Sequence, residues 1–66
     1  MSAEDFAHAI EIARARDKQG APAYLVVRPG RRVYVALWLH TAQMLAAAAP
    51  GSHIVHYGTG RLAPLE

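Results

Sequence analysis

The chain contains no cysteine, which removes two ways of stabilising a small domain. Neither a disulfide nor a thiolate metal site can form. A domain of this size, here 66 residues, buries only about 60% of the surface that its unfolded chain exposes, and it commonly needs a staple. Oligomerisation is the remaining way to stabilise such a domain, so we expect a homodimer. The absence of cysteine also fits a reducing compartment.

Acidic residues are few, and their placement argues against acid–base catalysis. Of the five carboxylates, Glu4, Asp5, Glu11 and Asp17 fall in one predicted helix, and Glu66 ends the sequence. A catalytic pair has to flank a cleft at a fixed separation, which neighbours on one helix do not do. No nucleophile-elbow pattern is present either. We expect no catalytic residue and no enzyme.

Long apolar runs are also missing. No stretch approaches the ~20 residues that a helix needs to cross a bilayer. The opening "MSAEDFAHA" is acidic, whereas a secretion signal or a transit peptide is basic at this end. We therefore expect a cytoplasmic protein with no membrane partner.

The residues that are present alternate between helical and strand-like patterns. Gly20 and Pro22 end the first helix, and Pro29-Gly30 marks a turn between two apolar runs. Thr41 is a plausible cap for the second helix, and Pro50-Gly51 ends it. The sequence predicts a helix over 2–19, strands over 23–28 and 32–38, a helix over 41–49, a strand over 53–57 and an irregular tail over 58–66.

This order, α-β-β-α-β, predicts a small α+β fold that forms one domain over residues 1–66. The connection from the second strand through the second helix to the third strand is long enough for a parallel crossover. The expected architecture is a mixed three-stranded sheet with two helices, completed by homodimerisation.

Both faces of the predicted hairpin are apolar, so neither shows the polar alternation of a half-solvated sheet. If both helices cover one face, the other stays exposed, and a second copy of the chain would cover it. We expect the turn to be slightly longer than two residues, or bulged, and to include an arginine. Pairing directly across Pro29-Gly30 places Tyr24, Val26, Val33, Val35 and Leu37 on one face and Leu25, Val27, Tyr34, Ala36 and Trp38 on the other.

Four histidines raise the question of a metal site. His53 and His56 lie three residues apart, a spacing that points the two rings to opposite faces of a strand. The stretch "YGTGR" contains Gly-x-Gly but lacks the third glycine and the helix of a dinucleotide fingerprint. We expect neither a metal nor another cofactor.

Positive charge gathers at the hairpin tip, beside aromatic residues. Tyrosine, tryptophan and arginine are the residue types enriched at protein-interface hot spots. We therefore expect a patch that covers an acidic surface of a partner protein. Its candidate residues are Arg28, Arg31, Arg32, Tyr34 and Trp38.

Three alternatives remain open for the same residues. Arginines beside stacking aromatic rings also bind single-stranded nucleic acid, which would give a small basic regulatory protein. Arginines at a hairpin tip can simply oppose edge-to-edge association, and the chain could be a structural subunit of a larger assembly. In size and composition the chain is similar to accessory proteins of bacterial viruses and mobile elements, which often bind and inhibit a host protein.

Overall fold

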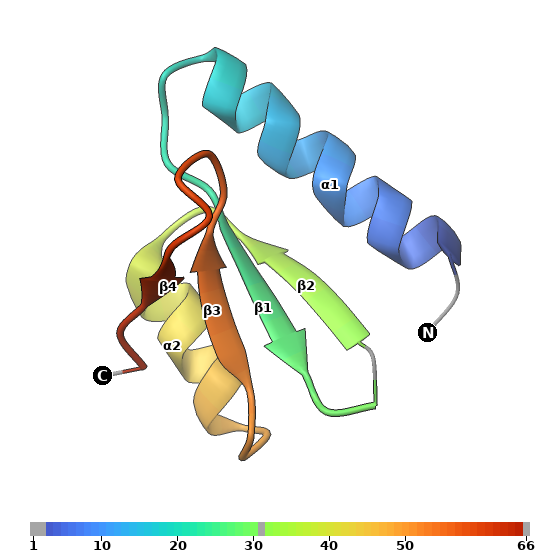
Figure 1. The fold of residues 1–66 in the computed structure, drawn as a ribbon, viewed down its shortest axis with the longest axis vertical. Helices are drawn as coiled ribbons and strands as arrows, with labels where there is room; N and C mark the ends of the chain where they lie inside the picture. The colour runs from blue at the N-terminus through green and yellow to red at the C-terminus, as the bar shows by residue number, and fades with distance from the viewer. Residues whose placement is uncertain (1–2, 31, 66) are drawn as a thin grey trace.

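The computed structural model describes residues 3–30 and 32–65 and shows an α+β fold, the class that the sequence predicts. One sheet lies between two helices (Figure 1). The elements, in chain order, are α1 (Ala3–Lys18), β1 (Tyr24–Arg28), β2 (Arg32–Ala36), α2 (Leu39–Ala47), β3 (His53–His56) and β4 (Leu62–Ala63).

Helix α1 ends where the sequence predicts. Gly20 has a φ of 76°, the left-handed conformation that glycine adopts without a steric penalty. The Gly20 N–H donates to the Asp17 carbonyl at 3.0 Å, and the Ala21 N–H donates to the Arg16 carbonyl at 3.1 Å. These two bonds form a Schellman motif, which satisfies carbonyls that the helix itself leaves unpaired.

The sheet differs from the predicted one in direction and in strand count. Its order is β2-β1-β3-β4, and every pairing is antiparallel. The predicted mixed sheet is wrong, because every described pairing is antiparallel. The connection through α2 does join two strands that run in the same direction, as expected, since β2 and β3 are both antiparallel to β1, which lies between them. Within the segment 58–66, which was expected to be irregular, β4 adds a short fourth strand.

The hairpin register also differs from the one predicted across Pro29-Gly30. Arg28 pairs with Arg32, so three residues, 29–31, link the strands, as the expectation of a longer turn requires. Each added residue in the link moves every β2 side chain to the opposite face. Tyr34 and Ala36 therefore share a face with Val26, whereas Val33 and Val35 share the other face with Val27, and the predicted face assignment is wrong.

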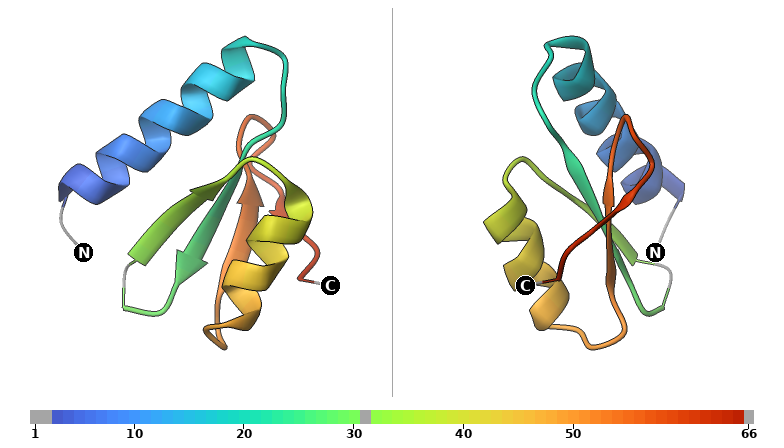
Figure 2. Two further views of the ribbon diagram at one scale, coloured as in Figure 1. Left: turned by 180° about the vertical axis from the view of Figure 1, so that it is seen from behind. Right: turned by 60° about the vertical axis from the view of Figure 1, so that its left-hand side comes forward.

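The two helices lie on opposite faces of the sheet (Figure 2). Helix α2 packs across β1, β2 and β3, whereas α1 packs mainly on β2 and only slightly on β1. The face with α2 is well covered, and the face with α1 is covered over β2 alone. The sequence predicted one fully exposed sheet face, whereas in the structure this face is only partly exposed.

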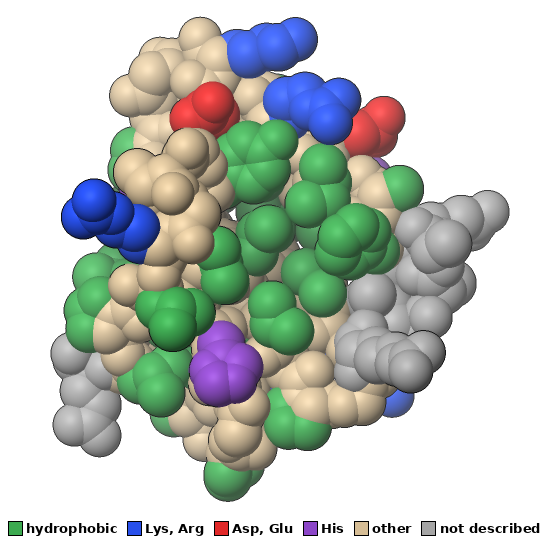
Figure 3. All heavy atoms as spheres, in the orientation of Figure 1, with side chains coloured by type: hydrophobic (Ala, Val, Ile, Leu, Met, Phe, Trp, Pro, Cys, Tyr) green, Lys and Arg blue, Asp and Glu red, His purple; other side chains and the backbone are tan. Residues whose placement is uncertain are grey.

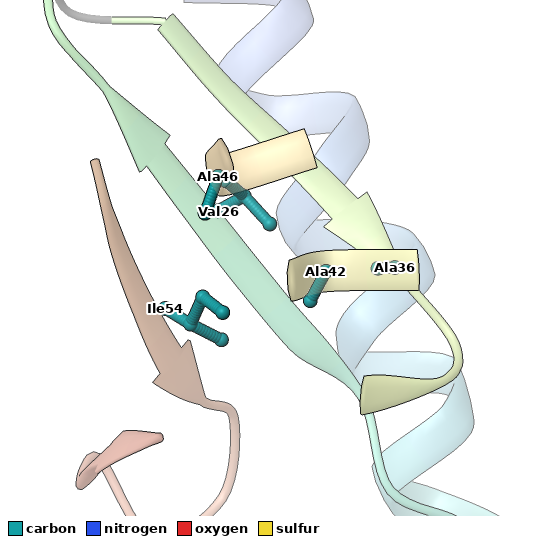
Figure 4. Packing of buried hydrophobic residues seen from close by; sticks show 5 residues of the cluster. All are labelled: Val26, Ala36, Ala42, Ala46 and Ile54. Carbon is teal, nitrogen blue, oxygen red and sulfur yellow. The ribbon is translucent and has the colours of Figure 1, made fainter. Parts of the chain in front are cut away.

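The core between α2 and the sheet is built largely from alanine. Of the eight hydrophobic side chains that are buried in the described part of the chain, six are alanine, and the two largest are Val26 and Ile54. Ala42 and Ala46 of α2 lie over Val26, Ala36 and Ile54 of the strands (Figure 4). Small side chains let the helix approach the sheet closely, but they remove little apolar surface from water.

The start of α2 lacks the predicted cap. Its N-cap residue is Trp38, whose side chain makes no capping hydrogen bond. Thr41 lies two residues inside the helix instead of before it, so its predicted role as a cap is wrong. The first turn of α2 therefore has no side-chain capping hydrogen bond, and Ala42 and Ala46 hold the helix against the sheet.

We expect Ile54→Ala to be among the most destabilising single substitutions, because Ile54 is 1% exposed and is the largest fully buried side chain. Removing a buried isoleucine to alanine costs about 2–5 kcal/mol of unfolding free energy. Urea denaturation followed by circular dichroism measures the loss. Val55→Ala, at the adjacent and only partly buried position, is the control and should cost clearly less; equal losses would contradict this description of the core.

Candidate functional site

Two arginines face each other at the tip of the β1–β2 hairpin. Arg28 ends β1, Arg32 begins β2, and the two are register partners. Like charges placed directly opposite each other in a sheet are destabilising. The repulsion between the two guanidinium groups therefore opposes folding of the hairpin.

Tyr34 lies on the same face of the hairpin, two residues along β2 from Arg32 and diagonally across from Arg28. The Arg28 guanidinium carbon is 5.1 Å from the centre of the Tyr34 ring, a cation–π distance. A side-chain hydrogen bond with Arg32 lowers the pKa of Tyr34 below its ordinary value of 10.0, and Arg28 adds a smaller effect in the same direction. Burial opposes this shift without reversing it. We call Arg28, Arg32 and Tyr34 the tip cluster.

The positive charge of the tip cluster has no internal counter-charge in the described structure. Among the side chains of residues 6–30 and 32–65, no carboxylate forms an ion pair with Arg28 or Arg32. Within the described part of the chain, the side-chain partner of both guanidinium groups is Tyr34. The guanidinium N–H groups that Tyr34 does not use can therefore bind an external anion.

A groove of about 440 Å³ runs beside the tip cluster, which is within the size range of ligand pockets. Four consecutive residues of β2, 32–35, line it. His8 and Ala9 of α1 line one side, and Leu45 of α2 lines the other. Successive strand residues point to opposite faces, so a groove touched by all four lies along the outer edge of β2, which we call the edge groove.

The structure brings together three of the five residues predicted from the sequence. Arg28, Arg32 and Tyr34 form the tip cluster, whereas Arg31 lies outside the described residues. Trp38 is 59% exposed. It follows β2 at the end away from the tip, since Arg32–Ala36 spans about 13 Å at the usual strand rise.

Sequence reasoning missed the helical residues of the site. Ala9 is an ordinary small core residue by pattern, and His8 and Leu45 carry no local signal for a groove. Their place in the site depends on α1 and α2 lying on opposite faces of the sheet. The sequence of either helix alone does not predict which face of the sheet that helix covers.

The histidines of β3 are separated by the sheet, as the sequence predicts. His53 pairs with Val27 and His56 pairs with Tyr24, which puts them on opposite faces. The His56 ring packs edge-on against the Tyr24 ring at 5.3 Å, and its Nδ1 lies 3.2 Å from the Thr59 hydroxyl. These contacts give His56 a structural role. In the described part of the chain no group of three or more potential ligands could hold a metal ion.

An apolar surface remains on the α1 side of the sheet. Hydrophobic side chains gather there, with charged groups at the margins (Figure 3). The strand registers place four of them together on this face, and Leu62 is 72% exposed. We call Leu25, Val27, Val55 and Leu62 the α1-side patch.

Comparison of the chain with known protein-family models, curated proteins and solved structures finds no significant match. Neither of the helices, over the residues that the structure describes, has the length and apolarity to cross a bilayer. The functional interpretation therefore depends on the geometry of this chain alone.

We expect Arg32→Gln to raise the pKa of Tyr34 toward that of an ordinary tyrosine, because Arg32 is the main cause of its lowered value. Arg28→Gln should raise it less. Ultraviolet titration of tyrosinate measures the change, and Tyr34→Phe assigns the transition among the three tyrosines. An unchanged titration in Arg32→Gln would show that the Arg32–Tyr34 contact does not persist in solution.

Proposed function

We propose that the chain is a protein-binding module without enzymatic activity, which covers an acidic segment of a partner protein. The observation that carries this proposal is the tip cluster, in which two arginines oppose each other with no described carboxylate between them. A carboxylate from a partner would relieve their repulsion and satisfy their N–H groups. Arginine binds carboxylates in a planar, two-point geometry that suits this task.

The edge groove favours a protein partner over a nucleic acid. Beside the arginine it presents Ala9, Val33, Val35 and Leu45, which are apolar. Apolar side chains of a partner protein can fill such a groove, whereas a phosphate backbone gains nothing from it. Nucleic-acid binding through the same arginines is the alternative, and salt dependence distinguishes it.

The mode of action that follows from this site is occlusion. The tip cluster and the edge groove adjoin each other on a fixed hairpin, so binding requires no catalytic group. A small protein that occupies a functional acidic surface inhibits its partner by excluding other ligands. An inhibitory accessory role fits this geometry.

We also propose that two copies associate through the α1-side patch. The four side chains of the patch carry no formal charge, so the same surface on two copies can meet without burying a charge. Symmetric dimers need this kind of self-complementary surface. The alanine-rich core adds a reason, since a domain with little buried apolar area gains proportionally more from an interface.

Binding of a fluorescein-labelled polyglutamate peptide tests the acidic specificity. We expect Arg32→Gln to weaken binding by roughly 10- to 100-fold, the worth of a charge-assisted hydrogen bond. Arg61→Gln removes the same charge near the opposite sheet edge and serves as the matched control, with little expected change. Tighter binding of a single-stranded DNA oligonucleotide, falling steeply with salt and lost in Arg32→Gln, would contradict the proposal and support the alternative.

Light scattering after size-exclusion chromatography tests the dimer. Leu62→Glu should convert the dimer to a monomer, because it places a charge in the α1-side patch. Met44→Glu is the matched control, since Met44 is 71% exposed but belongs to α2 on the other face, and it should remain dimeric. A wild-type chain that is monomeric up to its solubility limit would overturn this part of the proposal.

A further inference from the structure

The two guanidinium groups of the tip cluster converge on one point. Arg28 and Arg32 are register partners, and both donate side-chain hydrogen bonds to the Tyr34 hydroxyl oxygen. Donors that share one acceptor at the usual distance of about 3 Å lie within roughly 6 Å of each other. A single small anion can therefore contact both guanidinium groups at once.

Tyr34 holds this arrangement in place. The Arg28 guanidinium lies over the Tyr34 ring, with its carbon 5.1 Å from the ring centre. This contact involves the delocalised charge of the guanidinium and leaves N–H groups for other partners. The Tyr34 hydroxyl, which accepts from the arginines, can donate its own proton to the same anion. The tip cluster thus presents donors from three side chains that are already positioned, which lowers the cost of ordering them on binding.

The charge of the tip cluster matches that of a dianion. Both arginines stay protonated, and among the side chains of residues 6–30 and 32–65 no carboxylate pairs with either of them. One carboxylate neutralises only one of the two positive charges. A phosphate monoester carries about −1.5 to −2 at neutral pH and offers three acceptor oxygens. Two carboxylates supply the same charge only if two side chains that repel each other are ordered together.

The elements on the tip-cluster side of the sheet carry no acidic group. Neither the strands β1 and β2 nor the helix α2 contains a carboxylate. The nearby titratable group is His8 of α1, which lines the groove beside Arg32 and is cationic when protonated. His40 lies in the first turn of α2, and His53 lies on the opposite face of the sheet. Charge complementarity at this place therefore favours an anion of high charge.

We propose that the tip cluster binds the phosphate monoester of a phosphorylated side chain on the partner protein. This inference rests on the proposed function and specifies its acidic group. Arg28 and Arg32 donate to the phosphate oxygens, and the Tyr34 hydroxyl adds a third donor. A phosphodiester within a nucleic-acid strand carries one negative charge, so the match of charge favours a phosphoprotein over a nucleic acid.

The test compares three blocked peptides, Gly-Ala-X-Ala-Gly, in which X is phosphoserine, glutamate or serine. Chemical-shift titration by NMR measures their affinities and shows which residues respond. At neutral pH the phosphoserine peptide should bind about tenfold more tightly than the glutamate peptide, because it adds a charge-assisted hydrogen bond. The serine peptide should show no binding. Equal affinities of the phosphoserine and glutamate peptides would overturn the inference.

The second ionisation of the phosphate gives an independent readout. Its pKa is about 6, whereas glutamate ionises near pH 4.3. The ratio of the two affinities should therefore rise severalfold between about pH 5 and about pH 7.5. Protonation of His8 affects both peptides and cancels in this ratio. A ratio that stays constant with pH would show that the second negative charge is not recognised.

Two protein variants locate the phosphate. Arg28→Gln should reduce the preference for phosphoserine over glutamate to near unity, because a single cation then remains beside Tyr34. Arg61→Gln removes the same charge near the opposite sheet edge and should keep the full preference. If Arg28→Gln also keeps it, the phosphate binds elsewhere and the inference fails.

The outcomes separate this inference from the proposed function. If the phosphoserine and glutamate peptides bind equally and both lose affinity in Arg32→Gln, acidic recognition stands and phosphate specificity is overturned. If neither peptide binds, the inference is overturned and the polyglutamate experiment decides the proposed function separately. Thymidine 5′-monophosphate carries the same dianion on a nucleoside. Tighter binding of this nucleotide than of the phosphoserine peptide would assign the site to nucleotides and overturn the inference.

Discussion

The close approach of α2 to the sheet, made possible by alanine, is the constraint on which the rest of the structure depends. Ala42 and Ala46 meet Val26, Ala36 and Ile54, and larger side chains such as Tyr24 and Leu45 pack around them. The core is consequently thin, and it leaves β2 as an edge strand between two helices. The thin core buries few large apolar groups, and the opposite face of the sheet, which α1 covers mainly over β2, leaves Leu62 exposed.

Much of the fold could be predicted from local chemistry. The end of α1 followed from Gly20, and the strand segments followed from their apolar runs. The predictions that failed were the face of each β2 side chain, which depends on the number of residues in the hairpin link, and the strand order, which depends on long-range pairing. Pro29-Gly30 favoured a link longer than two residues, but the faces were assigned for pairing directly across it, and one extra residue in the link exchanged the faces of every β2 side chain. The choice of β1, not β2, as the neighbour of β3 is likewise a tertiary outcome.

The residues of the candidate site also fall into two groups: those that the local sequence could place and those that only the tertiary arrangement brings together. The sequence could place Arg28, Arg32 and Tyr34 near the same turn, but only the observed register puts the three side chains on one face. Trp38 could not be placed, since its position depends on how the chain leaves β2 and enters α2. The sequence could not predict the groove residues Ala9 and Leu45, because they come from separate helices. They line the same groove only because those helices lie on opposite faces of the sheet.

Charge assigns different partners to the two surfaces. The α1-side patch is uncharged, so it can face a copy of itself, whereas the β2 edge carries Arg32 and cannot do so without repulsion. The tip cluster suits a partner that brings a carboxylate, which the described strands of this chain do not contain. An arginine pair that destabilises the free hairpin thus also works against self-association at the edge. The same residues that weaken the isolated fold would select the partner that completes it.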